Sequence, residues 1–174
     1  MDKLITTYLE MTARSDFKPS FSCNPGLTII QSHVPLASFY RFLYNAVGAE
    51  WRWVDRNRWT DEQIETWLAQ PTTQLFVLYV NGTPGGYVEL DCQPEGTEIA
   101  YFGLIRRFFG HGYGAHLLSY GIQWAWDTGA RRVWVHTCNL DGPHALKNYE
   151  RRGFRVYHVD EKPMPPQYQP CSAN

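Results

Sequence analysis

The amino-acid sequence predicts an α/β fold in which helices flank one mixed, mostly antiparallel sheet. Strand and helix patterns alternate along 174 residues, a length typical of a single domain. Two apolar runs meet at Asn81-Gly82, which is the sequence of a tight hairpin turn. Further on, a strand pattern leads through three closely spaced glycines into a helical pattern. These observations together predict antiparallel strands next to a strand-to-helix unit.

The chain divides into an arm, one domain and a tail. The arm covers residues 1–25: residues 5–11 have strand composition with little alternation, which indicates a short edge strand, and prolines and serines in 16–25 indicate a loop. The domain is expected over residues 26–162. Four prolines in residues 163–174 predict a disordered tail.

The domain is expected to open with a strand and two helices. Residues 27–30 form the strand, and apolar residues at helical spacing predict a first helix over 36–47, with Gly48 as its end. Thr60 is expected to cap the second helix, and Gln63 completes a capping box.

A hairpin follows the second helix. Residues 75–80 and 87–90 are expected to pair across the Asn81-Gly82 turn. Asn81-Gly82-Thr83 also matches a glycosylation acceptor, but two flanking alternating runs are better explained by a type I′ turn. Residues 98–102 then form the strand that leads into the glycines.

The C-terminal part repeats strand and helix. Gly129 is expected to end the long helix that follows the glycines, and residues 133–138 alternate as a strand. Pro143 suits the first turn of a short helix that ends at Gly153. The last strand is expected at residues 154–158.

Composition limits the classes of function. The 16 basic and 17 acidic residues nearly balance, which argues against a nucleic-acid surface or an anionic membrane surface. The four cysteines lack paired spacing, and no apolar stretch is long enough for a signal peptide or a membrane span. These features predict a cytoplasmic protein with reduced thiols.

The three glycines Gly110, Gly112 and Gly114 stand where a strand gives way to a helix. Free backbone N–H groups and the positive end of the helix dipole meet there, which favours an anion such as a diphosphate. The G-x-G-x-G spacing lacks the third glycine of the dinucleotide fingerprint, and no Gly-Lys-Ser/Thr follows as in a phosphate loop. A tight turn is the simpler alternative, but it needs one glycine rather than three.

The run from Phe109 to Gly114 resembles the acetyl-coenzyme-A motif of the GNAT superfamily of N-acetyltransferases, Gln/Arg-x-x-Gly-x-Gly/Ala, with Phe109 in place of Gln or Arg. A second patch, from Ala145 to Phe154, is similar to the family's Ala-x-x-x-Tyr-x-x-x-Gly-Phe. The element order over residues 27–160 agrees as well. The resemblance implies the GNAT fold, acetyl-CoA as cosubstrate without a metal, and coenzyme contacts from Phe102, Leu104, Phe109, Gly110, His111, Gly112, Tyr113, Gly114 and Ala115.

The resemblance also implies catalytic roles. Glu98 matches the family's general base, and Tyr149 matches the tyrosine that protonates the leaving thiolate. Backbone N–H groups of Phe102 and Leu104 would hold the oxyanion and align the pantetheine arm. The simpler alternatives are a solvated carboxylate at a strand end and a tyrosine of the core.

Two other groups of residues were weighed as sites. His136, Cys138 and His144 match no zinc spacing, and strand alternation places His136 and Cys138 on one face as ordinary packing. The segment 50–56, a loop or short helical turn, lies where the resembling family covers its acceptor cleft. Its aromatic rings and carboxylates, from Glu50, Trp51 and Trp53, suit a cationic amine. The alternative is that both tryptophans pack under a loop.

The predicted function is an N-acetyltransferase that moves acetyl from acetyl-CoA to the primary amine of a small molecule by direct attack. No cysteine lies near the glycines to form a covalent intermediate. The alternatives are a protein or peptide amine as acceptor, or a non-catalytic acyl-CoA-binding sensor. The expected partner is thus a small-molecule or peptide amine, with neither nucleic acid nor membrane, and a homodimer is compatible with the sequence.

Overall fold

The computed structural model describes residues 3–168. Its elements, in chain order, are β1 (Lys3–Met11), β2 (Leu27–Ser32), α1 (Ala37–Gly48), α2 (Asp61–Leu68), β3 (Thr73–Val80), β4 (Thr83–Gln93), β5 (Gly96–Leu104), α3 (Tyr113–Asp127), β6 (Val133–Cys138), α4 (Ala145–Arg151) and β7 (Arg155–Pro163). Within these residues the strands form one seven-stranded sheet in the order β2-β3-β4-β5-β6-β1-β7. The pairing of β5 with β6 is parallel, and the other pairings are antiparallel. The predicted α/β class with a mixed, mostly antiparallel sheet is therefore confirmed.

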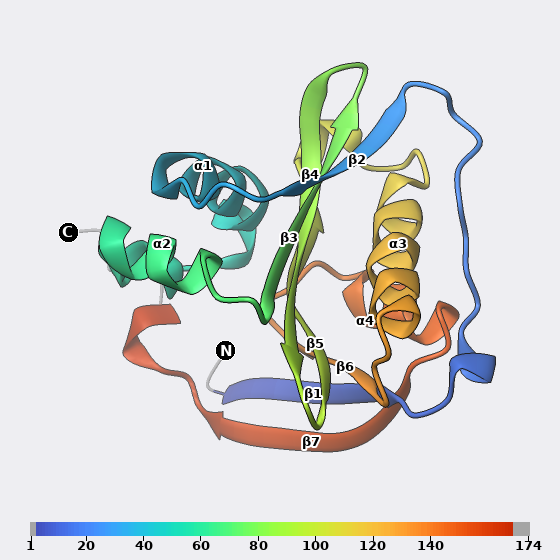
Figure 1. Ribbon diagram of the computed structural model, residues 1–174. Helices are drawn as coiled ribbons and strands as arrows, with labels where there is room; N and C mark the ends of the chain where they lie inside the picture. Colours follow the sequence, from blue (N-terminus) through green and yellow to red (C-terminus); the bar gives the residue numbers. More distant parts are fainter. Residues whose placement is uncertain (1–2, 169–174) are drawn as a thin grey trace.

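Helices cover both faces of the sheet: α1 and α2 lie on one side, and α3 and α4 lie on the other (Figure 1). Alternate residues of β3 pack against the helices on opposite faces of the sheet. Phe76 and Leu78 pack in the core that contains α3, whereas Leu75 and Val77 pack in the core that contains α1. Because both faces of β3 are buried, residues 75–80 form an unbroken apolar run rather than the alternating run expected from the sequence.

The turns and caps predicted from local sequence are present. Asn81 (φ 49°) and Gly82 (φ 82°) both adopt the left-handed conformation that a type I′ turn needs between β3 and β4. At the start of α2, the Thr60 side chain accepts from Gln63 N, and Gln63 Oε1 accepts from Thr60 N. These local interactions confirm the hairpin and the capping box.

The first helix ends at Gly48, as the sequence predicts, but not through a left-handed glycine. The backbone there is right-handed (φ −95°), and the chain continues as a 3₁₀ turn, Ala49–Trp51, up to Arg52 (φ 57°). A Cβ on Gly48 would lie 2.3 Å from the nearest ring atom of Trp53. The glycine is needed because an indole packs against the helix backbone, a contact that no local pattern reveals.

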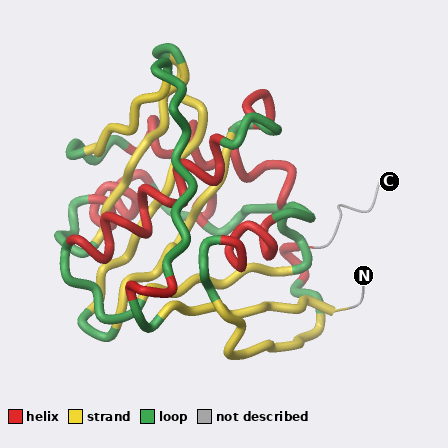
Figure 2. The backbone as a smooth tube through the Cα atoms, turned by 90° about the vertical axis from the view of Figure 1, so that its right-hand side faces the viewer, coloured by secondary structure: helices red, strands yellow, loops and turns green. Residues whose placement is uncertain are grey.

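The N-terminal strand is internal rather than an edge, which corrects the expectation from the sequence. β1 lies between β6 and β7 and pairs with both. Its partners are more than a hundred residues away in sequence, so local composition could not place it. The following loop runs along α3 (Figures 1 and 2), where Ser20 N donates to Ser119 Oγ (2.9 Å) and Ser22 N donates to His116 Nδ1 (3.2 Å).

Residues 163–168, the first part of the predicted tail, include regular backbone structure. Pro163 ends β7, and residues Pro166–Tyr168 form a 3₁₀ turn. The Tyr168 hydroxyl donates to Asp55 Oδ2 (2.8 Å), which fastens this turn to the segment between α1 and α2. Residues 169–174 lie outside the described residues, and the domain limits of 26 and 162 stay a prediction.

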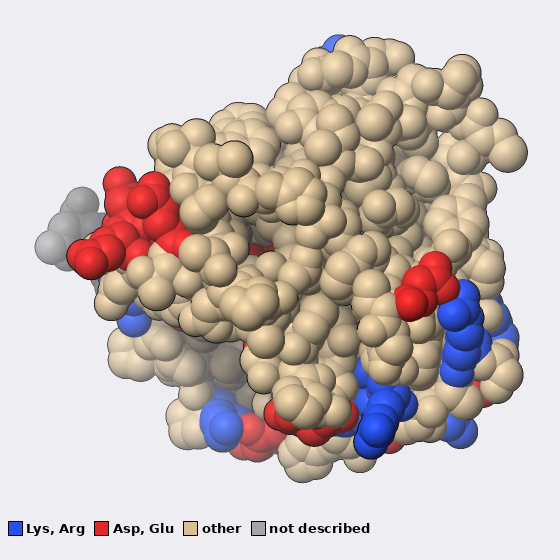
Figure 3. Space-filling view, in the orientation of Figure 1, with Lys and Arg blue, Asp and Glu red and all other residues tan. Residues whose placement is uncertain are grey.

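Charges are mixed on the surface. Figure 3 shows acidic side chains gathered over the first turn of α2, which carries Asp61 and Glu62, while basic groups alternate with acidic ones along the lower edge. In the part of the chain that the structure describes, Cys23, Cys92 and Cys138 are free thiols, and no helix has the length and apolarity needed to cross a bilayer.

Candidate active site

The sheet opens between β5 and β6. These strands pair only at Thr97↔Val133 and Glu98↔Trp134, and beyond these pairs they separate. On the other side of β5, Tyr101 pairs with Glu89 and Ile99 with Leu90, so one extra residue bulges from β5. A cavity of about 940 Å³ lies in the opening. The edge of β5 that faces this cavity therefore has backbone groups without a neighbouring strand.

The glycine loop forms one wall of this cavity. Gly110 (φ 82°) and Gly112 (φ 76°) are left-handed, and a Cβ on either would meet no heavy atom within 4 Å. Backbone conformation, and not crowding within the protein, is thus what demands glycine at these positions. Gly110, Gly112, Gly114 and Ala115 all line the cavity, as the sequence predicts.

The N-terminus of α3 is open to an anion. The first backbone hydrogen bond across its opening turn runs from His116 N to Gly112 O (3.2 Å), so the N–H groups of Tyr113, Gly114 and Ala115 have no partner within the helix. Among the described residues no side chain caps this end. Free N–H groups at the positive end of a 15-residue helix, beside the cavity, fit the diphosphate of coenzyme A.

Not all residues expected to contact the coenzyme face the cavity. Phe102, Leu104 and Phe109 line it, in addition to the loop residues named above. The side chains of His111 and Tyr113 do not: their rings stack on each other with centroids 5.3 Å apart, and the Tyr113 hydroxyl accepts from Asn24 Nδ2 (2.8 Å). The Tyr113 side chain thus contacts the N-terminal loop and the His111 ring stacks on it, while coenzyme contacts from these two residues stay a prediction.

Glu98 and His136 form a pair beside the cavity. Both line it, and His136 Nδ1 lies 3.0 Å from Glu98 Oε1. The hydrogen bond to Glu98 raises the pKa of His136, burial opposes it, and the charges of Glu98 and Asp141 add to the rise. In β6, Val133, Val135 and Thr137 are buried, whereas His136 is on the opposite, open face. The alternation was predicted correctly, but assigning His136 to ordinary packing was wrong, because that face of the strand borders the cavity.

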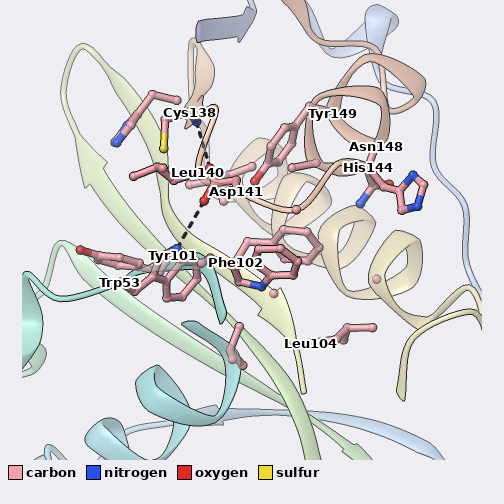
Figure 4. Close-up of a pocket in the computed structure, with 18 of the residues that line it drawn as sticks. Trp53, Tyr101, Phe102, Leu104, Cys138, Leu140, Asp141, His144, Asn148 and Tyr149 are labelled. Carbon is pink, nitrogen blue, oxygen red and sulfur yellow. Dashed lines mark hydrogen bonds between the residues drawn. The ribbon is translucent and has the colours of Figure 1, made fainter. Parts of the chain in front are cut away.

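Tyr149 enters the cavity from α4. It is 6% exposed and packs between the rings of Phe102 and Phe154, with centroids 6.2 and 6.0 Å away. Figure 4 shows its hydroxyl end directed toward the space between Asp141 and Phe102. Burial, and then the charge of Asp141, raise the pKa of Tyr149 above its usual value. The hydroxyl therefore stays protonated at neutral pH.

Asp141 joins the two sides of the opening. Its carboxylate accepts from Thr137 Oγ1 (2.6 Å) and Cys138 N (3.0 Å), and it accepts from Trp53 Nε1 (3.4 Å) across the cavity (Figure 4). Asn139, two residues before it, donates to Lys3 O (3.1 Å). Asp141 is thus the carboxylate of this loop that lines the cavity, together with Leu140, Gly142, Pro143 and His144.

The side chains of the predicted acceptor segment, residues 50–56, lie in two different surroundings. Trp51 and Trp53 line the cavity, and the Trp53 ring also packs against Tyr44 and Tyr101, with centroids 5.5 and 5.1 Å away. Trp53 therefore combines the packing and the lining roles that were alternatives in the sequence. Glu50 is not among the cavity residues: its carboxylate pairs with Arg106 (2.6 Å), because the 3₁₀ turn points neighbouring side chains in different directions. The role of Glu50 at the acceptor site therefore stays a prediction, since its carboxylate is bound to Arg106 outside the cavity wall.

Two charged or polar residues of the cavity have no counterpart among the residues considered from the sequence, namely Asp91 and Tyr168. Asp91 lies opposite Glu98 in the β4–β5 register. Counting residues along the predicted hairpin could have found it. Tyr168 carries no such signal, since a turn behind the last strand reaches the cavity only through the tertiary fold.

Comparisons with known proteins agree with this geometry. The family described as "Acetyltransferase (GNAT) family" matches residues 40–154. The mycothiol acetyltransferase of Corynebacterium efficiens is 33% identical over 102 residues, which are 59% of this chain and 34% of that protein, so the chain spans about a third of that relative's length.

Solved structures share the fold. A GCN5-related N-acetyltransferase from Sphaerobacter thermophilus has a TM-score of 0.68 at 18% identity, over 94% of this chain and 52% of that one. An aminoglycoside acetyltransferase from an uncultured soil metagenomic sample, in complex with sisomicin, has a TM-score of 0.61 at 16% identity, over 74% of this chain and 88% of that one. The family match includes the glycine loop and Tyr149, and it covers well over half of the sequence; the chain therefore belongs to the acetyltransferase (GNAT) family.

Proposed function

We propose that this protein transfers an acetyl group from acetyl-CoA to the primary amine of a small molecule by direct attack. One observation carries the proposal: a single cavity holds an uncapped helix N-terminus, the Glu98 carboxylate and the buried Tyr149 hydroxyl. These are the three groups that the reaction needs, namely an anchor for the diphosphate, a base and an acid.

Each group has a defined task. Acetyl-CoA supplies the acetyl thioester and places its diphosphate at the N–H groups of Tyr113, Gly114 and Ala115. Glu98 takes a proton from the acceptor ammonium, and the neutral amine then attacks the thioester carbonyl. As the C–S bond breaks, the thiolate takes a proton from Tyr149, which regains one from the acetylated nitrogen. An ammonium and a thioester thus become an amide, a thiol and one released proton.

The chemistry of the cavity supports a cationic acceptor. Asp55, Asp91 and Glu98 contribute carboxylates to its wall, and Trp51 and Trp53 contribute aromatic rings. Carboxylates and aromatic faces attract an ammonium before it loses its proton. A small acceptor is favoured because two of the similar proteins are named as acetyltransferases of small molecules, mycothiol and aminoglycosides. A cytoplasmic location, the absence of a metal and a homodimer stay predictions.

Thiol release from acetyl-CoA tests the proposal. The acceptors are sisomicin, glucosamine, putrescine and a peptide with one lysine, and mass spectrometry identifies the acetylated product. The proposal requires turnover with at least one of the small amines. Turnover of the peptide alone would favour a protein acceptor. Calorimetric binding of acetyl-CoA without turnover of any amine would favour the acyl-CoA sensor.

A further inference from the structure

His136 lies within hydrogen-bonding distance of the Glu98 carboxylate. The two side chains come from the strands that separate at the cavity, and they meet at 3.0 Å through Nδ1 and Oε1. Glu98 is the inner partner, with 19% of its side chain exposed, whereas His136 is the outer one, with 47% exposed. The imidazole is thus in contact with both the carboxylate and the open side of the cavity.

The hydrogen bond defines the tautomer. An ionised carboxylate only accepts hydrogen bonds, so Nδ1 must carry a proton whenever Glu98 is charged. Nε2 is then the nitrogen that gains or loses a proton with pH. Histidine is the side chain whose ordinary titration lies closest to neutral pH, so its charge can change under working conditions.

We propose that His136 is a positioning residue that orients Glu98 toward the acceptor and allows it to act as a base only when the imidazole is neutral. The inference rests on the proposed function, because it gives Glu98 the role of base. A neutral imidazole holds Oε1 and leaves Oε2 free to take the ammonium proton. An imidazolium in the same place stabilises the charged carboxylate and so lowers its affinity for that proton.

The charged groups around His136 favour its protonated form, and burial opposes them. Glu98 faces it from β5, Asp141 lies near it in the loop after β6, and both charges favour the imidazolium. From β1, Tyr8 pairs with His136, with ring centroids 5.8 Å apart, and on its own strand Trp134 lies at 6.3 Å. The pKa of His136 is accordingly above its ordinary value of 6.5. Activity should therefore be low below this pKa and rise as pH increases through it.

Two substitutions test the role through the pH profile. His136→Asn places an amide N–H where Nδ1–H lies but cannot titrate, and His136→Ala removes the donor. The probe is acetyl-CoA with the fastest small amine of the panel above; the amine's own titration is common to all variants. In His136→Asn the acid limb of kcat/KM should move down by at least one pH unit, with a plateau reduced less than tenfold. In His136→Ala the plateau should fall tenfold or more.

An NMR titration supplies a readout without turnover. The His136 ring should titrate above pH 6.5 in the wild type and at a lower pH in Glu98→Gln. An unchanged acid limb in an active His136→Asn, or an unchanged His136 midpoint in Glu98→Gln, would overturn the inference. Failure of the proposed function is distinct, since it would appear as a wild type that acetylates no amine.

Discussion

Two glutamates on neighbouring strands, Glu89 and Glu98, have different surroundings and different roles. Glu89 of β4 is fully buried, and its carboxylate accepts from Tyr40 Oη (2.6 Å), Trp67 Nε1 (2.8 Å) and an Arg56 guanidinium nitrogen (3.3 Å). Glu98 of β5 has one hydrogen-bond partner among the described side chains, His136, and it lines the cavity, which Glu89 does not.

The difference lies in what remains available on each carboxylate. At Glu89, an arginine and two further donors use the oxygens, and the Arg56 guanidinium itself lies 3.8 Å from the centroid of Trp59. A carboxylate so fully bonded stabilises the fold and has little capacity to take a proton from a substrate. At Glu98, one oxygen is held and the other stays open toward the cavity. A general base needs a carboxylate like that of Glu98, with one oxygen still free to take a proton from the substrate.

The largest effect is expected from substituting these two glutamates, one of which should change the rate and the other the stability. Glu98→Gln should lower kcat/KM by about 10²- to 10⁴-fold at neutral pH, as the loss of a general base does, with little change in stability. Glu89→Gln should instead cost about 3–5 kcal/mol of unfolding free energy, because the buried Arg56 loses its counter-charge. Denaturant titrations and steady-state kinetics on both variants check this. A slow but fully stable Glu89→Gln would contradict the assignment.

The next effect compares two buried tyrosines. Tyr149→Phe should lower turnover roughly 10- to 1,000-fold, about 1.4–4 kcal/mol of transition-state stabilisation, while coenzyme affinity stays constant. Tyr40→Phe removes the hydroxyl that donates to Glu89 and should cost about 1–3 kcal/mol of stability without slowing the reaction. Rates that fall equally in both variants would show that Tyr149 acts through the fold rather than as the acid.

The smallest effect is expected from substituting the two left-handed glycines that flank α3. Gly112, before its first residue, and Gly129, after its last, both have positive φ and open space where a Cβ would lie. Valine at either position should cost a similar free energy, on the order of 1–2 kcal/mol. Gly112→Val alone should weaken acetyl-CoA binding, at least tenfold by calorimetry, since its Cβ branch enters the space of the diphosphate. Equal affinity in the two variants would remove the loop as the anchor.

Structural features that depend on residues within one short segment were predicted correctly from the sequence. The Asn81-Gly82 turn, the Thr60 cap and the glycines before α3 each depend on residues a few positions apart. Features that a distant segment decides were not predicted. β1 pairs with β6 and β7, more than a hundred residues away, and the Glu50 carboxylate pairs with Arg106, which no local pattern indicates.

The sequence by itself determined the α/β class, the hairpin, the glycine loop at a helix N-terminus and the two residues, Glu98 and Tyr149, that now share one cavity. These follow from backbone preferences and from motifs that are continuous in the chain. Only the tertiary structure decided that β1 is internal, that Tyr168 folds back to Asp55 and that His136 meets Glu98. The physical reason is that each of these contacts joins residues far apart in sequence, and their approach depends on how the whole sheet pairs and where it opens.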